Sequence, residues 1–190
     1  MASPAPSPPV SDPRLRHRTI ALVGLMGVGK SSLGRRLAVA LDLPFRDADE
    51  EIEKAAGRTV PEIFAERGEA EFRDGERRVI ARLLDEPPHV LATGGGAFVQ
   101  GETRALLKAK ALTVWLKADI ETLARRVGRK EGRPLLTGKD PVKALTDMAE
   151  VRYPSYAEAE IHVETGETAH AQAVQAVLDA LANHLRQADQ

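Results

Sequence analysis

The chain has 190 residues, enough for one substantial domain with its own hydrophobic core. Its 27 basic residues nearly balance its 28 acidic residues, so no overall field favours nucleic acid or an anionic membrane as a partner. Cysteine is absent, which excludes disulfides and thiolate metal sites and suits the cytoplasm. No apolar stretch approaches the roughly 18 residues that a membrane span needs.

Residues 1–18 are rich in proline and serine and contain few large apolar side chains. Such a segment cannot bury enough surface to order itself, so we predict a disordered tail there rather than a targeting peptide. A single domain is expected over residues 19–190.

Short apolar strands alternate with longer helical periods from Thr19 onward. Strands are expected at residues 19–25, 43–49, 89–93, 112–118 and 161–165. Helices are expected at residues 30–43, 49–57, 61–84, 119–127, 140–160 and 169–186. This alternation indicates a three-layer α/β domain, with a five-stranded parallel sheet, helices on both faces and ligands at the carboxyl ends of the strands.

The stretch "GLMGVGKSS", residues 24–32, follows the first strand and matches the P-loop pattern. Its glycines let backbone N–H groups turn around phosphate oxygens at the start of a helix. Lys30 is expected to reach the β- and γ-phosphates, and the Ser31 hydroxyl to complete a magnesium shell. We therefore predict ATP and Mg²⁺ as ligands, with nucleotide contacts from Gly27, Val28, Gly29, Lys30, Ser31 and Ser32.

Two acidic residues, Asp47 and Asp49, end the second strand. One explanation is helix capping, with Asp49 as the N-cap. Beside a nucleotide, however, phosphoryl transfer needs a group that orients the attacking hydroxyl and another that holds magnesium through water. We assign Asp49 to the hydroxyl and Asp47 to the metal. The third strand ends in "TGGG", residues 93–96, and not in a metal-binding aspartate, so Asp47 is the more needed as a metal ligand.

The basic stretch "GRKEGRPLL", residues 128–136, is either a surface crossover or a mobile lid. We favour a lid at about residues 126–139, in which Arg133 reaches the phosphates. Pro134 supports this interpretation because it pushes the preceding residue out of helical geometry. Taken alone, Arg73 and Arg152 are ordinary helical cations.

Together these motifs resemble the shikimate kinase family over about residues 19–182. The resemblance is carried by "GLMGVGKSS", "DADEEIE", "GRTVPEIFAERGEAEFRDGE", "LATGGGA", "RRVGRKEGRPLL" and "RYPSYAEAE". It implies a P-loop kinase fold with the strand order 2-3-1-4-5 and a mobile lid. It also implies ATP-dependent phosphorylation of the 3-hydroxyl of shikimate to shikimate 3-phosphate, on the route to chorismate and the aromatic amino acids.

The resemblance also implies roles for the residues that bind the acceptor. Asp49 would hold the 3-hydroxyl, Arg73 and Arg152 would clamp the carboxylate, and Gly95 would lie against the ring. Paired guanidiniums fix a carboxylate in orientation as well as in position. Two aromatic residues, Phe64 and Phe72, match positions that line the ring.

On the nucleotide side, Lys30, Asp49 and Arg133 are the expected catalytic residues. Arg133 would touch the transferred phosphate, and Ser31 with Asp47 would hold magnesium. Arg126 is expected to stack on the adenine. The alternatives are a kinase for another small hydroxy acid such as gluconate, or for a nucleoside monophosphate, and a nucleotide-binding module without catalysis. We expect a monomer with no nucleic-acid or membrane partner.

Overall fold

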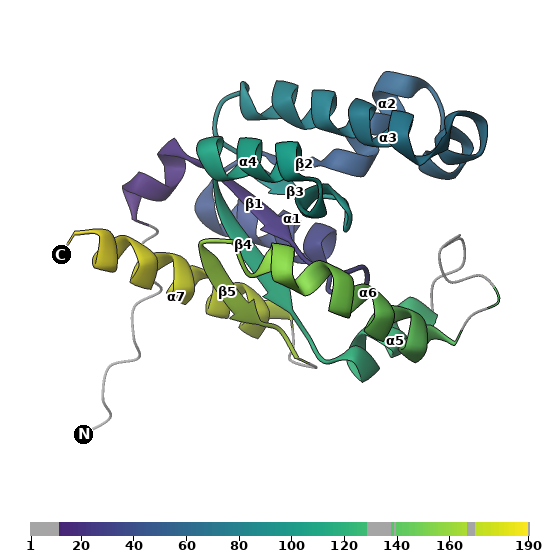
Figure 1. Ribbon diagram of the computed structural model, residues 1–190. Helices are drawn as coiled ribbons and strands as arrows, with labels where there is room; N and C mark the ends of the chain where they lie inside the picture. The colour runs from purple at the N-terminus through teal and green to yellow at the C-terminus, as the bar shows by residue number, and fades with distance from the viewer. Residues whose placement is uncertain (1–11, 129–137, 139, 167–169, 190) are drawn as a thin grey trace.

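The computed structural model describes residues 12–128, 138, 140–166 and 170–189 (Figure 1). Five parallel strands form one sheet in the order β2-β3-β1-β4-β5, which confirms the predicted topology. The strands are β1 (Thr19–Val23), β2 (Phe45–Asp47), β3 (Val90–Ala92), β4 (Ala111–Lys117) and β5 (Ile161–Glu164).

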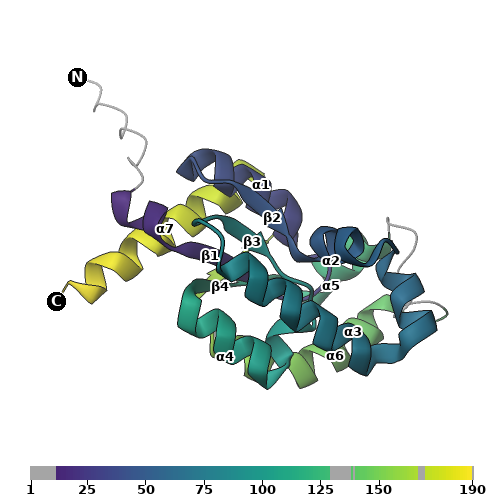
Figure 2. The same ribbon diagram turned by 90° about the horizontal axis from the view of Figure 1, so that it is seen from above.

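Helices cover both faces of the sheet (Figure 2). On one face lie α1 (Lys30–Leu41) and α7 (His170–Ala188), which contact each other. The other face carries α3 (Val60–Leu84), α4 (Gly101–Lys110) and α6 (Pro141–Tyr156). Two shorter helices pack on these at the carboxyl-end edge, α2 (Ala48–Ala56) on α3 and α5 (Ile120–Gly128) on α6. Single 3₁₀ turns form η1 (Pro13–His17) and η2 (Ala97–Val99).

The central strand β1 is buried along its whole length, as its apolar sequence predicts for a strand covered on both faces. The helix that follows it, α1, buries the predicted stripe of Leu33, Leu37 and Leu41, each no more than 3% exposed. The P-loop therefore joins two elements that are both fixed by the core.

The start of α2 differs from the prediction. Asp47, not Asp49, caps this helix, because the Asp47 carboxylate accepts hydrogen bonds from the backbone N–H groups of Asp49, at 3.0 Å, and Glu50, at 3.4 Å. Extended backbone ends at Asp47, so β2 is shorter than predicted. The predicted stop at Gly57 is confirmed, with a left-handed φ of 65° at the C-cap.

The folded part of the chain begins before Thr19, which corrects the predicted tail at residues 12–18. Asp12 accepts a hydrogen bond from the backbone of Arg14 and caps η1. Leu15 is 3% exposed and belongs to the core, and Arg14 pairs with Asp189 at the end of α7 at 2.8 Å. The prediction of disorder for residues 1–11 lies outside the described residues.

His89 precedes β3 and is buried, at 1% exposure. Its Nδ1 lies 2.9 Å from the carbonyl oxygen of Pro87, and within the described part of the chain Nε2 has no hydrogen-bond partner. Burial lowers the pKa of His89, because desolvation disfavours the imidazolium. The folded state therefore holds a neutral imidazole at a pH where the unfolded chain binds a proton.

We expect His89 to make the free energy of unfolding pH-dependent. As pH falls through the ordinary histidine range, the unfolded chain gains a proton that the folded chain does not, so stability falls by up to about 1.4 kcal/mol per pH unit. The His89→Asn variant should lose this part of the slope in urea unfolding between pH 7 and 5. Exposed His170 supplies the control, His170→Asn, which should keep the wild-type slope. Equal slopes in wild type and His89→Asn would contradict the prediction.

Candidate active site

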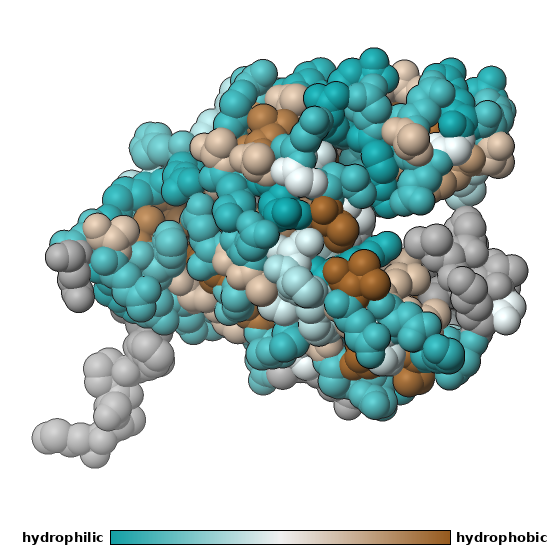
Figure 3. Space-filling view, viewed as in Figure 1, coloured by the Kyte–Doolittle hydropathy of each residue, from teal (hydrophilic) through white to brown (hydrophobic). Residues whose placement is uncertain are grey.

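Three strands end at the same edge of the sheet. Ala92 at the end of β3 is in register with Leu22 of β1 and with Asp47 of β2. The segments that follow these strands are the P-loop, the Asp47–Asp49 turn and the Gly94–Gly96 turn. The surface is hollowed at this edge, between the part formed by α2 and α3 and the part formed by α6 (Figure 3). The P-loop, the Asp47–Asp49 turn and the Gly94–Gly96 turn thus meet at one cleft.

The P-loop backbone requires glycine at its start. Gly24 has a φ of 145°, and a β-carbon there would lie 2.5 Å from the carbonyl oxygen of Leu116. Gly27 and Gly29 also have left-handed φ values, and Gly29 is the N-cap of α1. The loop therefore ends at a helix N-terminus, whose dipole and free N–H groups favour a phosphate.

The side chain of Lys30 folds back onto the P-loop backbone. It is 9% exposed, and its Nζ donates to the carbonyl oxygens of Gly24, at 2.8 Å, and Leu25, at 3.0 Å. Val28 packs in the core, and the Ser32 hydroxyl accepts a hydrogen bond from Arg36 at 3.0 Å. The cation thus lies among the loop's own backbone.

The structure brings Ser31 and Asp47 together. The Ser31 hydroxyl donates to Asp47 Oδ2 at 2.5 Å, which joins the first turn of α1 to the end of β2. The other oxygen of Asp47 caps α2. A hydroxyl and a carboxylate oxygen thus lie side by side at the mouth of the P-loop.

Gly94 separates two carboxylates. A β-carbon added to Gly94 would lie 2.8 Å from Glu76 Oε1 and 3.1 Å from Asp49 Oδ1. Asp49 is an exposed residue, although many protein atoms lie near its carboxylate. This desolvation raises the pKa of Asp49, and the negative charge of Asp47 raises it further.

Two arginines adjoin the next two glycines. A β-carbon on Gly95 would lie 3.1 Å from Arg152 Nη1, and one on Gly96 would lie 2.2 Å from Arg73 Nη2. Arg152 also lines a cavity of about 570 Å³ along α6. Asp49, Arg152 and Arg73, which the sequence analysis assigned to the acceptor, therefore each adjoin one glycine of this turn.

Glu76 is a site residue that the sequence analysis missed. It is 1% exposed and pairs with Arg73 at 2.7 Å, while in the described ranges its Oε1 has no hydrogen-bond partner. Burial raises the pKa of Glu76, and the positive charge of Arg73 opposes that rise. The Arg73 guanidinium also lies over the rings of Phe72, at 5.2 Å, and Phe64, at 6.0 Å. The spacing of Arg73 and Glu76 on one helix was the available signal.

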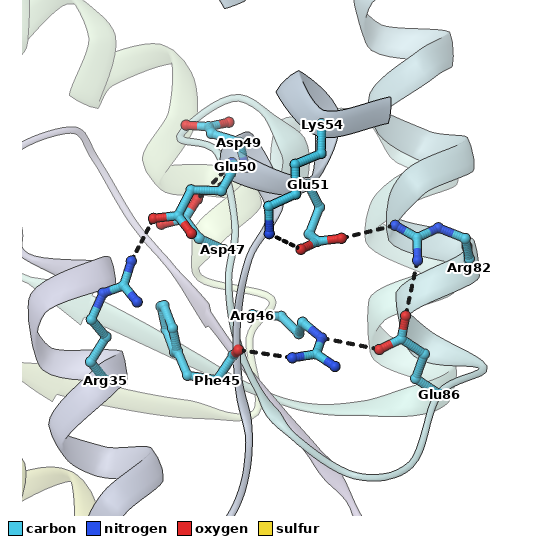
Figure 4. A network of polar contacts seen from close by, with 10 residues as sticks. All are labelled: Arg35, Phe45, Arg46, Asp47, Asp49, Glu50, Glu51, Lys54, Arg82 and Glu86. Carbon is cyan, nitrogen blue, oxygen red and sulfur yellow. Dashed lines mark hydrogen bonds and ion pairs between the residues drawn. The ribbon is translucent and has the colours of Figure 1, made fainter. Parts of the chain in front are cut away.

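Ion pairs hold α2 from both sides (Figure 4). Glu50 pairs with Arg35 of α1 at 2.5 Å, and Glu51 pairs with Arg82 of α3 at 3.1 Å. The Arg35, Glu50 and Arg82 side chains are about half exposed, so each pair contributes little to the free energy of unfolding. Together they connect α2 to α1 and to α3.

Two of the expected site residues fall within the predicted lid at about residues 126–139. Arg133, like residues 129–137 as a whole, lies outside the described part of the chain. Arg126 is described, and its guanidinium donates to the carbonyl oxygen of Gly166 at 2.8 Å. It therefore ties α5 to the segment after β5.

The parallel sheet, the P-loop and the facing cluster of carboxylate and guanidinium groups define a P-loop kinase. A family model described as shikimate kinase matches residues 26–182. The chain belongs to the shikimate kinase family.

Relatives and solved structures of this family are similar over most of the chain. The shikimate kinase of Caulobacter vibrioides is 74% identical over 88% of this chain and 84% of its own length. That of Bradyrhizobium diazoefficiens is 53% identical over 90% and 83%. A structure of shikimate kinase from Acinetobacter baumannii in complex with shikimate has a TM-score of 0.84 and 39% identity, covering 87% of this chain and 93% of its own.

The P-loop geometry predicts that ATP stabilises the protein through Lys30. At a concentration 100 times its Kd, a nucleotide should add about 2.7 kcal/mol and raise Tm by roughly 5–10 °C. Lys30→Met should abolish most of this shift in a thermal unfolding experiment. The control is Lys54→Met, a mostly exposed lysine of α2, which should keep the full shift. An undiminished shift in Lys30→Met would remove Lys30 from nucleotide binding.

Proposed function

We propose that this chain transfers the γ-phosphoryl group of ATP to the 3-hydroxyl of shikimate, giving shikimate 3-phosphate and ADP. The observation that carries the proposal is the Gly94–Gly96 turn, beside which Asp49, Arg152 and Arg73 converge next to the P-loop. Shikimate is a small carboxylate with three hydroxyls. It therefore needs one anion site and one group that orients a hydroxyl toward the triphosphate.

Arg73 and Arg152 supply the anion site. Because Arg73 is held by Glu76 and by two aromatic rings, its guanidinium keeps one orientation before the acceptor arrives. Arg152 approaches Gly95 from α6. Two guanidiniums of this kind hold a carboxylate in both position and orientation, and Gly95 leaves room for the ring to lie against the backbone.

Asp49 orients the attacking hydroxyl and accepts its proton. Its raised pKa suits this role, because a base with a pKa closer to neutrality takes a proton more readily. Because phosphoryl transfer passes through a loose transition state, the enzyme mainly has to align the hydroxyl with the γ-phosphate and neutralise the charge on the phosphates. Lys30 supplies charge at the β- and γ-phosphates, and Arg133 is proposed to supply it from the lid.

Mg²⁺ fits the pair formed by Ser31 and Asp47. Hydroxyl and carboxylate oxygens are the ligands that magnesium takes beside nucleotide phosphates, and these two lie within 2.5 Å of each other. Ser31 would bind the ion directly and Asp47 through water. When bound, the ion neutralises charge on the phosphates. Arg126 is proposed to lie against the adenine, near its hydrogen bond to Gly166.

The alternatives are weaker on these observations. Gluconate and nucleoside monophosphates are anions too and would also be bound by guanidiniums, so what favours shikimate over them is the 74% and 53% identity of the chain to named shikimate kinases. A non-catalytic nucleotide-binding module gives no reason for a carboxylate of raised pKa beside the P-loop. Among the described residues, no helix has the length and hydropathy that crossing a lipid bilayer requires. We propose that the enzyme acts in the cytoplasm as a monomer.

The proposed reaction predicts that magnesium-ATP and shikimate together release ADP. Purified protein is assayed for ADP release with shikimate, gluconate, AMP or no acceptor. Release should depend on shikimate, and the other three reactions should stay close to the rate of ATP hydrolysis by water. A higher rate with gluconate or AMP than with shikimate would assign a different acceptor.

The position of Asp49 predicts a loss of turnover when its charge is removed. Asp49→Asn should lower kcat by at least about 100-fold while leaving ATP binding nearly intact. The neighbouring exposed carboxylate supplies the control, Glu50→Gln, which should keep most of the activity. In wild type, kcat/KM should fall as the pH drops through the raised pKa of Asp49, since only the ionised carboxylate accepts the proton. Near-normal turnover in Asp49→Asn would exclude this role.

A further inference from the structure

Tyr156 lies behind the acceptor site and has no role in the proposed mechanism. It is the last residue of α6, four positions after Arg152, and its side chain is fully buried. Its hydroxyl donates a hydrogen bond to the carbonyl oxygen of Gly95. The Arg152 side chain also interacts with the hydroxyl oxygen of Tyr156, and its Nη1 lies 3.1 Å from the position that a β-carbon on Gly95 would take. One hydroxyl thus connects the middle glycine of the turn with one guanidinium of the anion site.

The surroundings give this hydroxyl a fixed place. The Tyr156 ring packs against Trp115 of β4, with ring centroids 5.9 Å apart, and Trp115 is itself 6% exposed. Burial raises the pKa of Tyr156 to about 12, so the hydroxyl keeps its proton at neutral pH. It can therefore donate to Gly95 and accept from Arg152 at the same time.

We propose that Tyr156 is a positioning residue for the acceptor's carboxylate, holding Arg152 and the Gly95 carbonyl in one arrangement through its hydroxyl. This inference rests on the proposed function. An arginine side chain has many rotamers, and one that is fixed in advance loses less freedom when an anion binds. A carboxylate that stays unchanged during phosphoryl transfer is bound equally in the ground and transition states, so Tyr156 should act on KM rather than on kcat.

A purely structural role makes a different prediction. If the hydroxyl only satisfied the buried carbonyl of Gly95, its removal would lower stability and would affect both substrates alike. If it acts through Arg152, its removal should affect the acceptor alone. It should also have no further effect once the Arg152 guanidinium is gone.

The test compares Tyr156→Phe with wild type in steady-state kinetics, varying shikimate and magnesium-ATP in turn. The KM for shikimate should rise about tenfold or more, while kcat and the KM for ATP stay within about threefold. Adding Tyr156→Phe to an Arg152→Ala background should leave the KM of that background unchanged. Tyr153 supplies the control, because it also packs on Trp115, at 5.0 Å, but is only half-buried and donates nothing to Gly95 in the described structure. Tyr153→Phe should match wild type.

Three results would overturn the proposal. They are an unchanged KM for shikimate in Tyr156→Phe, an equal rise in the KM for ATP, and a further rise of the same size in the Arg152→Ala background. Near-normal kcat and ATP binding in Tyr156→Phe show that the variant has folded. Turnover of shikimate by the wild type tests the proposed function by itself, whereas the ratio of variant to wild type tests Tyr156, so the two proposals can fail separately.

Discussion

Parallel pairing of β1, β2 and β3 is the constraint on which the site depends. Parallel strands point their carboxyl ends to one edge, and the register of Leu22, Asp47 and Ala92 makes these three strands end together. Their following segments must then share one region of space, although they lie far apart in the sequence. The buried core on both faces of β1 keeps that edge rigid, so polar groups can be held there in fixed positions.

The second requirement is a positive site in a protein whose charges nearly cancel. Arg73 supplies a guanidinium there, which its ion pair with the almost completely buried Glu76 orients but also partly neutralises. Taking both charges out of water costs free energy, and removing one partner of such a pair typically costs about 3–5 kcal/mol. The pair therefore fixes a guanidinium at the cleft at some cost to stability. The aromatic rings of Phe64 and Phe72 limit the other directions in which it could turn.

The two halves of the site are built differently. The nucleotide half is a local loop, in which Gly24, Gly29 and Lys30 lie within a few residues of one another and set the class of enzyme. The acceptor half is assembled from side chains of three helices, α2, α3 and α6, that converge on the Gly94–Gly96 turn. A P-loop indicates only that the protein binds the phosphates of a nucleotide. The residues that converge on the turn decide which acceptor receives it, and this is why fold and function must be argued separately.

The sequence by itself determined the features that depend on short-range spacing: the P-loop, the apolar stripe of α1 and the helix stop at Gly57. The motifs also supplied the strand order, through the family resemblance. Only the tertiary structure decided that Asp47 caps α2, that Leu15 belongs to the core, and that Tyr156 reaches Gly95. These contacts join residues far apart in the chain or choose between neighbours with the same chemistry. The spacing of residues in the sequence does not predict these contacts, because they are decided by side-chain packing and by the register of the sheet.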